Sequence, residues 1–407
     1  MKMPKIRFND FKNEWKKEKL CNIVSRITRK NKNLESHTPL TISAIEGLVS
    51  QLTYFNNIVA SSNISGYYLI KNGEFAYNKS YSNGFPYGSI KRLDKFDMGV
   101  LSTLYIVFAL NKQNTSILSD YLVLFFNTTL WYHEVAKRAE EGARNHGLLN
   151  ISADDFFDIN IIYPKDLLEQ QKIASYFQKL ESLIQTTSKK LATLKRIKAA
   201  SLQSMFPQEG ETVPKVRFKE FEGEWEEKSF SALYKKSIIK NDLTFGTDKI
   251  ISVANMYYLT NVNVSDLEYL KTYNIMKLGD IAFEGNKSKR FLHGRFVENT
   301  IGDGIVSHVF VVFHPISAEH DINYWKYAIN NENIMRNVLI RCTKSSTMMT
   351  DLVVDDFLKE TILVPTYAEQ QKIGAYFRNL DRQISLQTQR LEKLKQIKAA
   401  CLDKMFV

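Results

Sequence analysis

The feature that most constrains this chain is a 38-residue segment that occurs twice. Residues 169–206 and 369–406 align without a gap, and 19 of their 38 positions are identical. The shared runs EQQKI, IKAA and MF stand in one register. Two unrelated charged helices would not agree in this way, so we infer an internal duplication.

Each copy of the segment predicts one long helix. Its apolar residues recur at intervals of three and four, which is the coiled-coil period. Asp166 and Thr366 stand three positions before Glu169 and Glu369, the spacing of a capping box. A helix of this length is roughly 57 Å long, and its apolar seam needs a partner. The nearest matching partner is the other copy; the alternative is that each helix packs on its own globular domain.

The duplication extends to the segments that precede the helices. The opening PKIRF of residues 4–8 returns as PKVRF at 214–218, and Trp15 returns as Trp225. The spacing between matching positions falls steadily from 210 at these openings to 200 at the helices. Two colinear domains with small loop differences behave this way. We therefore predict four segments, with boundaries at residues 1–166, 167–206, 207–366 and 367–407.

Each globular half is predicted to be a small α/β (α+β) domain with a twisted, mostly antiparallel sheet. Short apolar runs predict strands, and one helix is expected in each half. The helices are expected at Ser119–Ala139 and Ile322–Ile340, and the strands at Leu104–Leu110, Val309–Phe313, Ile159–Tyr163 and Thr361–Val364.

The two halves differ most in the segments between these shared elements. Ser50–Tyr68 diverges from Leu259–Lys271, and Asn78–Lys95 diverges from Gly285–Gly302. Two copies of one scaffold with different loops suggest related recognition of two different targets.

Composition narrows the kind of partner and the compartment. The 407 residues include 55 Lys and Arg against 44 Asp and Glu, a net charge of +11 that fits a polyanion. The three cysteines are scattered and show no disulfide pattern, which indicates a reducing cytoplasm. The N-terminus lacks an apolar signal region, and no apolar run approaches the ~20 residues that span a bilayer. We expect a cytoplasmic protein without a membrane partner.

The sequence argues against catalysis by this chain. It contains no phosphate-binding P-loop, no G-x-G-x-x-G that opens a helix and no [DN]-P-P-[YF] motif of adenine-N6 methyltransferases. The histidines and cysteines lack metal-ligand spacing. The pairs Asp154-Asp155 and Asp355-Asp356 are interpreted as turns or helix caps rather than metal-binding carboxylates. We therefore predict no catalytic and no metal-ligating residues.

These motifs together resemble the specificity subunit of type I restriction-modification enzymes over nearly the whole chain. The resemblance is carried by the two openings, the strands KNGEFAYNK and GVLSTLYIVF, and the loop GARN before LLNISADDFF. It is also carried by the helix starts YPKDLLEQQKIASYF and VPTYAEQQKIGAYF. One departure is that Thr343-Lys344-Ser345-Ser346 replaces GARN in the second half.

The resemblance implies two target recognition domains joined by two long antiparallel coiled-coil helices. Each domain would read one half of a bipartite, asymmetric site in double-stranded DNA. The chain would bind two modification (methyltransferase) subunits and would recruit restriction (translocase and nuclease) subunits. It would carry no cofactor, since S-adenosylmethionine, ATP and Mg would belong to the partner subunits.

Candidate DNA-contacting residues are the cationic and polar side chains of the predicted loops. Lys and Arg neutralise phosphates, and Arg, Lys, Asn and Gln also read base edges. In the first half we select Lys79, Ser80, Tyr81, Lys91, Arg92, Arg144, Asn145 and His146. In the second half we select Asn286, Lys287, Lys289, Arg290, Lys344 and Ser345.

A different class of function remains open at this point. The chain could be a coiled-coil scaffold whose two globular halves bind protein partners. A salt-dependent, duplex-specific interaction with DNA separates the two hypotheses, because a scaffold would show none.

Overall fold

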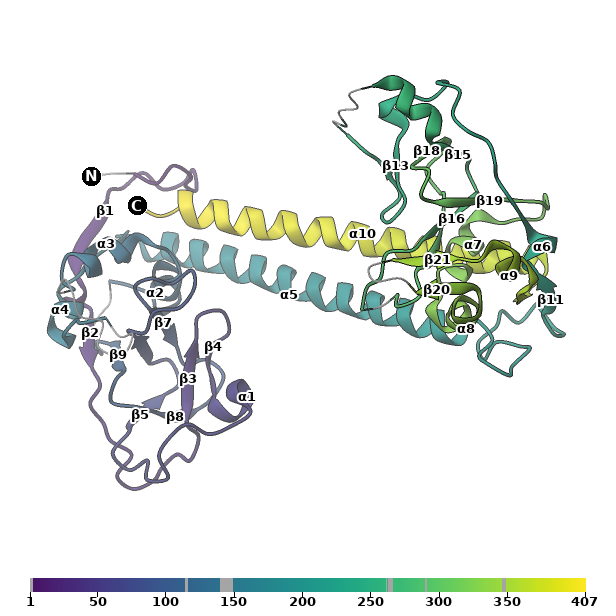
Figure 1. Ribbon diagram of the computed structural model, residues 1–407. Coiled ribbons are helices and arrows are strands. Elements are labelled where there is room, and N and C mark those ends of the chain that lie inside the picture. Colours follow the sequence, from purple (N-terminus) through teal and green to yellow (C-terminus); the bar gives the residue numbers. More distant parts are fainter. Residues whose placement is uncertain are drawn as a thin grey trace. The chain divides into compact units, whose positions relative to one another are not determined.

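The computed structural model describes residues 3–113, 116–139, 149–260, 262, 266–289, 291–345 and 349–407. The chain forms two compact units (Figure 1). The first unit comprises Met1–Thr186 and Leu391–Val407, and the second comprises Thr187–Arg390. Each unit contains a globular domain and a part of both long helices.

The repeated segments form single unbroken helices, as predicted. Helix α5 spans Leu167–Ser204 and helix α10 spans Tyr367–Lys404, each with 38 residues. The Asp166 carboxylate accepts a hydrogen bond from the Leu168 amide at 2.8 Å, and the Thr366 hydroxyl accepts one from the Glu369 amide at 3.4 Å. Both residues therefore cap the helix that follows them.

A four-stranded antiparallel sheet forms the centre of the first unit, in the order β2-β9-β6-β7. Two-stranded ladders β3–β4 and β5–β8 form an outer lobe, and β1 pairs with β10. The strands are β1 (Trp15–Lys19), β2 (Val24–Arg26), β3 (Leu40–Ser43), β4 (Gly47–Ser50), β5 (Tyr68–Lys71), β6 (Phe75–Asn78), β7 (Ser89–Arg92), β8 (Met98–Leu101), β9 (Ile106–Leu110) and β10 (Asn160–Pro164). The helices are α1 (Gln51–Phe55), α2 (Ser119–Phe126), α3 (Leu130–Ala136) and α4 (Ala153–Phe157).

The second unit repeats this plan, with the sheet order β12-β19-β16-β17. Its smaller ladders are β11–β22, β13–β14, β15–β18 and β20–β21, all antiparallel. The strands are β11 (Glu226–Ser229), β12 (Tyr234–Lys236), β13 (Ile251–Ser252), β14 (Tyr257–Tyr258), β15 (Asn274–Met276), β16 (Ile281–Glu284), β17 (Arg295–Glu298), β18 (Gly304–Val306), β19 (Val311–Pro315), β20 (Thr343–Ser345), β21 (Thr350–Leu352) and β22 (Thr361–Val364). The helices are α6 (Phe230–Leu233), α7 (Ile322–Ala328), α8 (Glu332–Cys342) and α9 (Val354–Lys359).

The expectation of one helix per half in these stretches was wrong. Ser119–Ala139 contains both α2 and α3, and Ile322–Ile340 contains α7 and most of α8. The break in the second unit occurs at Asn331, whose side chain accepts a hydrogen bond from the Asn333 amide and so starts a new helix. Apolar periodicity continues across the break because both short helices pack on the same core, and this hides the break from the sequence.

Within each unit, α5 and α10 pack side by side and antiparallel. In the first unit, Tyr176 contacts Cys401, and Lys398 forms an ion pair with Glu181. In the second unit, Ser201 contacts Tyr376, and Lys198 forms an ion pair with Asp381. Along the pair, residue numbers rise on one helix while they fall on the other, so the helices run antiparallel. The helix seam is therefore covered by the other copy, as the repeat predicted.

The same helices also contribute to the globular cores. Ile173 and Phe177 of α5 belong to the first core, and Ile373 and Phe377 of α10 belong to the second. Each long helix therefore also packs on its own globular domain through its first turns, as the alternative hypothesis expected.

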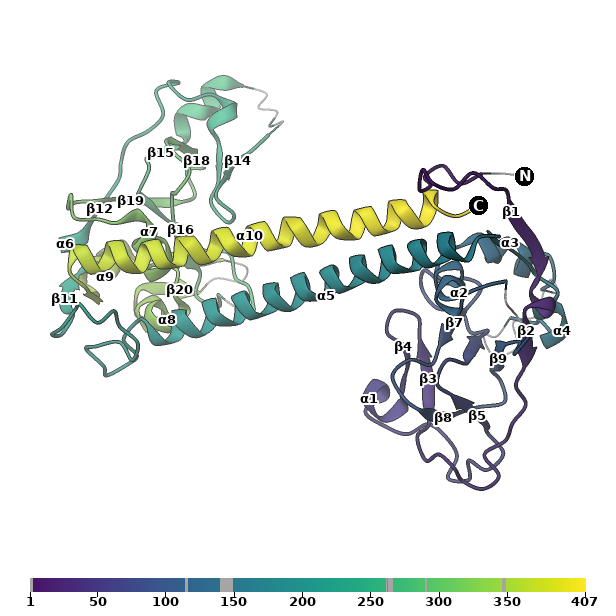
Figure 2. The same ribbon diagram turned by 180° about the vertical axis from the view of Figure 1, so that it is seen from behind.

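The end of each helix completes a core. Phe406, after α10, packs against Trp15, Tyr121 and Phe177 of the first unit. The N-terminal segment lies beside this helix end, and the Ile6 amide donates to the Lys404 carbonyl at 2.9 Å (Figure 2). Phe206, after α5, likewise packs against Trp225, Tyr324 and Phe377 of the second unit.

Among the described residues, no helix combines the length and the apolar character needed to cross a membrane.

Candidate nucleic-acid interface

A buried ion pair joins the opening of each half to its long helix. Arg7 donates to both carboxylate oxygens of Glu169, at 2.7 and 2.8 Å, and Arg217 does the same to Glu369 at 2.8 Å. Both glutamate side chains are only 1% exposed. The hydrogen bond to Glu169 raises the pKa of Arg7, and the guanidinium stays charged. The glutamate of EQQKI therefore serves this pair rather than a reciprocal capping box.

The first glutamine of each EQQKI run holds the backbone near the helix start. The Gln170 amide donates to the carbonyls of Pro164 and Ser116, and its oxygen accepts from the Leu118 amide at 2.7 Å. Gln370 donates to the Pro365 carbonyl and accepts from the Asp321 amide. These contacts fix each globular domain on its long helix.

In the second unit, the predicted loops converge. Lys287, in the loop after β16, has its ammonium group 2.5 Å from the Ser345 hydroxyl on β20. Gly285 accepts a backbone hydrogen bond from Thr350 at 2.9 Å, and Asn286 forms an isolated bridge with Met349. A Cβ at Gly285 would lie 2.2 Å from the Thr350 carbonyl oxygen, so this close approach requires glycine.

Two further predicted residues lie beside this contact. Lys344 and Lys289 are exposed, the first on β20 and the second in the loop after β16. Arg290 lies outside the described residues. The second unit thus has Asn286, Lys287, Lys289, Lys344 and Ser345 in the loop after the central strand β16 and on β20, which contact each other through Lys287 and Ser345.

The first unit has the same relationship at the matching place. The Lys79 carbonyl accepts from the Leu149 amide at 3.0 Å, and the Lys79 ammonium donates to the Ile151 carbonyl at 3.2 Å. Burial lowers the pKa of Lys79. Ser80 donates its amide to Asn78, and Tyr81 is 53% exposed in the same loop. Arg144, Asn145 and His146 lie outside the described residues.

Lys91 and Arg92 lie apart from these loops, on strand β7. Arg92 is ion-paired with Asp94 at 2.6 Å and with Asp120 at 2.7 Å, and it also donates to the Ser119 hydroxyl. These partners tie β7 to α2, so a phosphate would have to compete with them. Lys91 donates to the Asn127 side chain at 2.8 Å.

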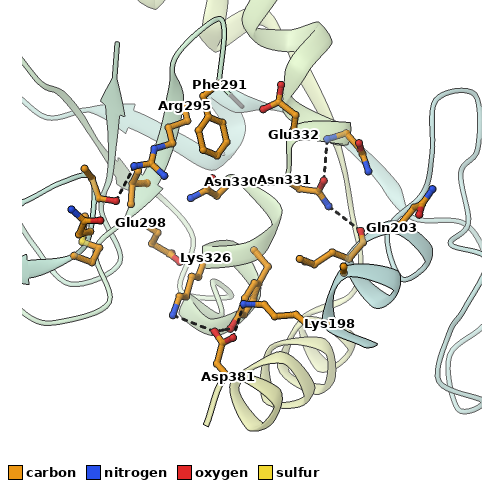
Figure 3. A pocket seen from close by; sticks show the side chains of 18 residues that line it. Lys198, Gln203, Phe291, Arg295, Glu298, Lys326, Asn330, Asn331, Glu332 and Asp381 are labelled. Atoms are coloured by element: carbon orange, nitrogen blue, oxygen red, sulfur yellow. Dashed lines mark hydrogen bonds and ion pairs between the residues drawn. The ribbon is translucent and has the colours of Figure 1, made fainter. Parts of the chain in front are cut away.

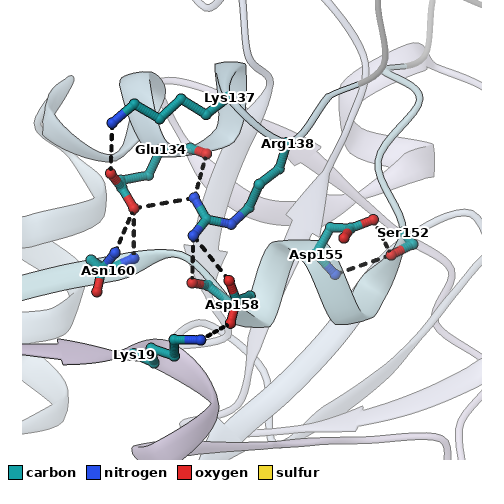
Figure 4. A network of polar contacts seen from close by, with 8 residues as sticks. All are labelled: Lys19, Glu134, Lys137, Arg138, Ser152, Asp155, Asp158 and Asn160. Atoms are coloured by element: carbon teal, nitrogen blue, oxygen red, sulfur yellow. Dashed lines mark hydrogen bonds and ion pairs between the residues drawn. The ribbon is translucent and has the colours of Figure 1, made fainter.

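A polar network in the first unit has a structural role (Figure 4). Arg138 bridges Glu134 on its own segment to Asp158, which also pairs with Lys19. Asn160 donates to Glu134 from both its backbone and its side chain. Burial alone would raise the pKa of Glu134, but the hydrogen bonds from Asn160 and the nearby Arg138 lower it to about 2. The network anchors α3 to β10.

Sequence reasoning missed a cavity of about 570 Å³ in the second unit (Figure 3). Arg295 on its wall donates to Glu284 at 2.6 Å and to the Ala254 carbonyl at 2.8 Å, and it lies over the Phe291 ring. Its opposite side is formed by Lys198 and other residues of α5, α7 and α10. The divergence of Gly285–Gly302 marked the region, but no local motif marked the individual residues.

The two paired aspartates lie where helix caps were expected. Asp154 and Asp155 are in the first turn of α4, where Ser152 accepts a hydrogen bond from the Asp155 amide. Asp355 and Asp356 are in the first turn of α9. Acidic side chains are favourable at these positions because helix N-termini carry partial positive charge. Among the described residues, no group of three His, Cys, Asp or Glu side chains is placed to hold a metal ion.

Comparison with known proteins finds a matching family model and matching folds. Residues 222–396 match the family model of the type I restriction modification DNA specificity domain. The fold matches the crystal structure of the type I restriction-modification S subunit from M. genitalium with a TM-score of 0.57. That match has 12% identity and covers 100% of this chain and 99% of that one.

The second half of the chain thus matches the type I DNA specificity domain, and the whole chain has the fold of an S subunit.

Two more solved structures are similar to this chain. The HsdS subunit from Thermoanaerobacter tengcongensis gives a TM-score of 0.48 at 14% identity, over 97% of this chain and 96% of that one. A chain from a study of complex assembly and conformational transition in the type I R-M system gives 0.49 at 14% identity, over 97% and 98%. The search of curated proteins found no match.

The matched model describes a DNA specificity domain, and it assigns residues 222–396 a role in DNA recognition. Specificity subunits are the non-catalytic members of type I complexes, and their partners are DNA and the other subunits of the complex. The family places no cofactor on the specificity subunit.

Proposed function

We propose that each globular domain is a target recognition domain that reads one half of a bipartite, asymmetric DNA site. The domains are residues 1–166 and 207–366, and the helices 167–206 and 367–407 act as the spacer. Two modification subunits bind the chain and carry S-adenosylmethionine, and restriction subunits add ATP- and Mg-dependent translocation and cleavage. The complex acts in the cytoplasm.

The observation that carries this proposal is the repeated meeting of two polar segments in each unit. The loop after the central strand β6 or β16 lies against the segment that precedes α4 or α9. The framework around this meeting is shared, while the loop residues differ. Two domains that read different half-sites need the same fold with different side chains in the loops that contact DNA.

The proposed contacts comprise the loop residues and the strand pair Lys91 and Arg92. In the first domain they are Lys79, Ser80, Tyr81, Lys91, Arg92, Arg144, Asn145 and His146. In the second domain they are Asn286, Lys287, Lys289, Arg290, Lys344 and Ser345.

The test uses the chain assembled with its modification subunits. We expect Lys287→Ala to weaken DNA binding. If Lys287 contacts a phosphate, binding falls evenly across sequences and the salt slope drops by about one; if it reads a base, discrimination falls at one position. Lys219→Ala, which removes an exposed lysine outside the loops, is the matched control. Unchanged affinity, slope and motif for Lys287→Ala would remove this loop from the interface.

A domain exchange tests whether the two readings are separable. Replacing residues 21–160 by the same region of a related chain should change one half-site of the methylated motif and leave the other. Methylome sequencing of cells that express the hybrid with the modification subunits gives the answer. A hybrid that changes both half-sites would mean that the domains read jointly. Absence of salt-dependent binding to duplex by the wild-type complex would favour the scaffold alternative.

A further inference from the structure

Two lysines of the second unit share one carboxylate at the floor of the cavity in Figure 3. The Lys198 ammonium on α5 lies 2.5 Å from one oxygen of Asp381 on α10, and the Lys326 ammonium on α7 lies 3.9 Å from the other. The Tyr327 hydroxyl also donates to Asp381 at 2.5 Å. We call Lys198, Lys326 and Asp381 the second corner, since they lie where the globular domain meets the helix pair.

The first unit carries a related group, which we call the first corner: Lys398, Lys91 and Glu181. Lys398 on α10 lies 2.5 Å from Glu181 on α5, the positions that match Lys198 and Asp381 in the repeat. Lys91 supplies the second lysine from strand β7. Burial, with a smaller contribution from the charge of Lys398, lowers the pKa of Lys91 to about 8.

An asparagine stands at the matching place in both corners. Lys91 donates to Asn127 at 2.8 Å. Asn330 lines the cavity of the second corner and follows Asn127 by 203 positions, the same interval that separates Tyr121 from Tyr324. Those two tyrosines pack on Phe406 and Phe206 respectively, so they mark equivalent places in the two cores.

In the second corner two ammonium groups face one carboxylate, and in the first corner the charge of Lys398 acts on Lys91 while Lys398 pairs with Glu181, so each corner has a local surplus of positive charge. Other charged groups around the second corner are matched elsewhere or lie apart from it. Arg295 pairs with Glu284, and Glu332 lies on the opposite wall of the cavity (Figure 3). Glu298 contacts His320, and burial raises its pKa well above the usual range, which favours the neutral acid.

Arg92 is the further cation near the first corner. Its guanidinium is matched by Asp94 and Asp120, so it does not add to the surplus.

We propose that each corner binds one phosphate group of the DNA backbone, through Lys326 and Lys198 in the second unit and through Lys91 and Lys398 in the first. This inference rests on the proposed function. Compact ammonium groups bind phosphate as point charges, and two of them facing one carboxylate retain the capacity to do so. Contacts to the backbone position a protein on duplex without reading sequence.

Two observations favour DNA over an acidic segment of a partner protein. On the cavity wall, Phe291 and Arg295 follow Lys289 of the loop Asn286–Lys289 by two and six positions. Lys91 lies on β7, which pairs with β6, and β6 leads into the loop of Lys79. The ion pair between α5 and α10 also recurs at matching positions, Lys198 with Asp381 and Lys398 with Glu181, although the loops beside the corners diverge. A sequence-independent contact is expected to be retained in this way, while contacts that read bases change.

The experiment substitutes the lysine that does not join the two helices, so that the helix pair is preserved. Lys326→Gln and Lys91→Gln are each assembled with the modification subunits. Affinity for a specific duplex and for a random duplex is then measured across a salt series. Each variant should reduce the salt slope by about 0.9, the value for one phosphate contact, and weaken both duplexes by the same factor. The methylated motif should stay the same.

The controls separate a lost charge from a disturbed fold. Lys91→Arg and Lys326→Arg keep the charge and should restore most of the slope. Lys12→Gln and Lys219→Gln remove exposed lysines elsewhere in each unit and should leave the slope unchanged.

Two results would overturn the inference. One is an unchanged salt slope for both glutamine variants in fully assembled complexes. The other is a loss of subunit assembly in sedimentation with a normal slope for the assembled fraction, which would assign the corners to an acidic segment of the modification subunit. A wild-type complex without salt-dependent DNA binding would instead refute the proposed function itself.

Discussion

The guanidinium of Arg7 contacts both carboxylate oxygens of Glu169, 162 positions further along the chain. The pair is almost fully buried, and Arg217 and Glu369 repeat it in the second unit. Loss of one partner leaves an uncompensated charge in a poorly solvated place, which is the costly way to break a buried pair.

We therefore expect Arg7→Met to destabilise the first unit by about 3–5 kcal/mol. The double variant Arg7→Met with Glu169→Gln should recover part of that loss, because no buried charge remains. Lys172→Met, which breaks a solvent-exposed pair with Asp10, should cost at most about 1 kcal/mol. Hydrogen exchange of the first unit's amides checks all three, and equal effects of Arg7→Met and Lys172→Met would contradict the expectation.

The terminal Phe406 offers a test of how the first core is completed. Its ring is 5% exposed and lies among Trp15, Tyr121 and Phe177. Phe406→Ala should destabilise the first unit by about 3–5 kcal/mol through the cavity it leaves. Ile397→Ala, at an exposed helix position, should change stability by no more than about 0.5 kcal/mol.

Location of the effect is as informative as its size. Exchange should accelerate in the amides of the first globular domain for Phe406→Ala and in those of the second for Phe206→Ala. Acceleration confined to the last turns of α10 would show that the terminal residues contribute little to the core.

Glu134 should make the first unit sensitive to acid. Its pKa in the folded state is about 2, below the ordinary glutamate value. A depressed pKa adds stability that is fully present above the unfolded-state pKa of about 4.3 and disappears as the pH falls towards 2. Glu134→Gln should thus cost roughly 1–2 kcal/mol at pH 7 after solvent screening, and this cost should vanish over that window. Urea unfolding at several pH values measures it, with the exposed Glu14→Gln as the control; a cost that did not depend on pH would refute the electrostatic origin.

The proposed spacer role of the helices predicts how the DNA site responds to insertions. Four residues inserted between Lys189 and Lys190, and four between Gln389 and Arg390, lengthen both helices by ~6 Å. The gap between half-sites should then grow by roughly one or two base pairs, since DNA rises 3.4 Å per base pair. Methylome sequencing of the variant gives the gap and both half-sites. An active variant whose gap is unchanged would show that the helices do not set the spacing.

Several elements of the fold could be predicted because their signals are local. The 38-residue helices carry an uninterrupted period and a marked start, and strands β9, β10, β19 and β22 follow from short apolar runs. The antiparallel pairing followed from the need to cover an apolar seam. The order of the strands could not be predicted, because pairing between strands far apart in sequence leaves no local trace.

The predicted site residues also divide into features with a local sequence signal and features that depend on distant segments of the chain. Lys79 and Lys287 could be selected as loop cations, but their contacts with Ile151 and Ser345 depend on chain segments about 60–70 positions away. The role of Arg92 as a link to Asp94 and Asp120 could not be foreseen, since a cation on a strand looks the same whether or not it is paired. Of the corner lysines, Lys91 was among the selected residues, but Lys326 and Lys398 were not, because each is ordinary alone and only the fold brings the corner residues together.

The position of the helix ends bears on how this chain arose. Each globular core is closed by a Met-Phe pair that the sequence places after the other half's helix: Met405 and Phe406 in the first, Met205 and Phe206 in the second. In a chain with one copy of the repeat, the Met-Phe pair would be exposed to solvent and the core would lack the side chains that complete it. A second identical chain could supply those side chains. A single-copy ancestor of this chain is therefore expected to have paired with an identical chain as a self-complementary homodimer. Fusion of two such copies would free the halves to diverge, and under the proposed function this would turn a reader of palindromes into a reader of asymmetric sites.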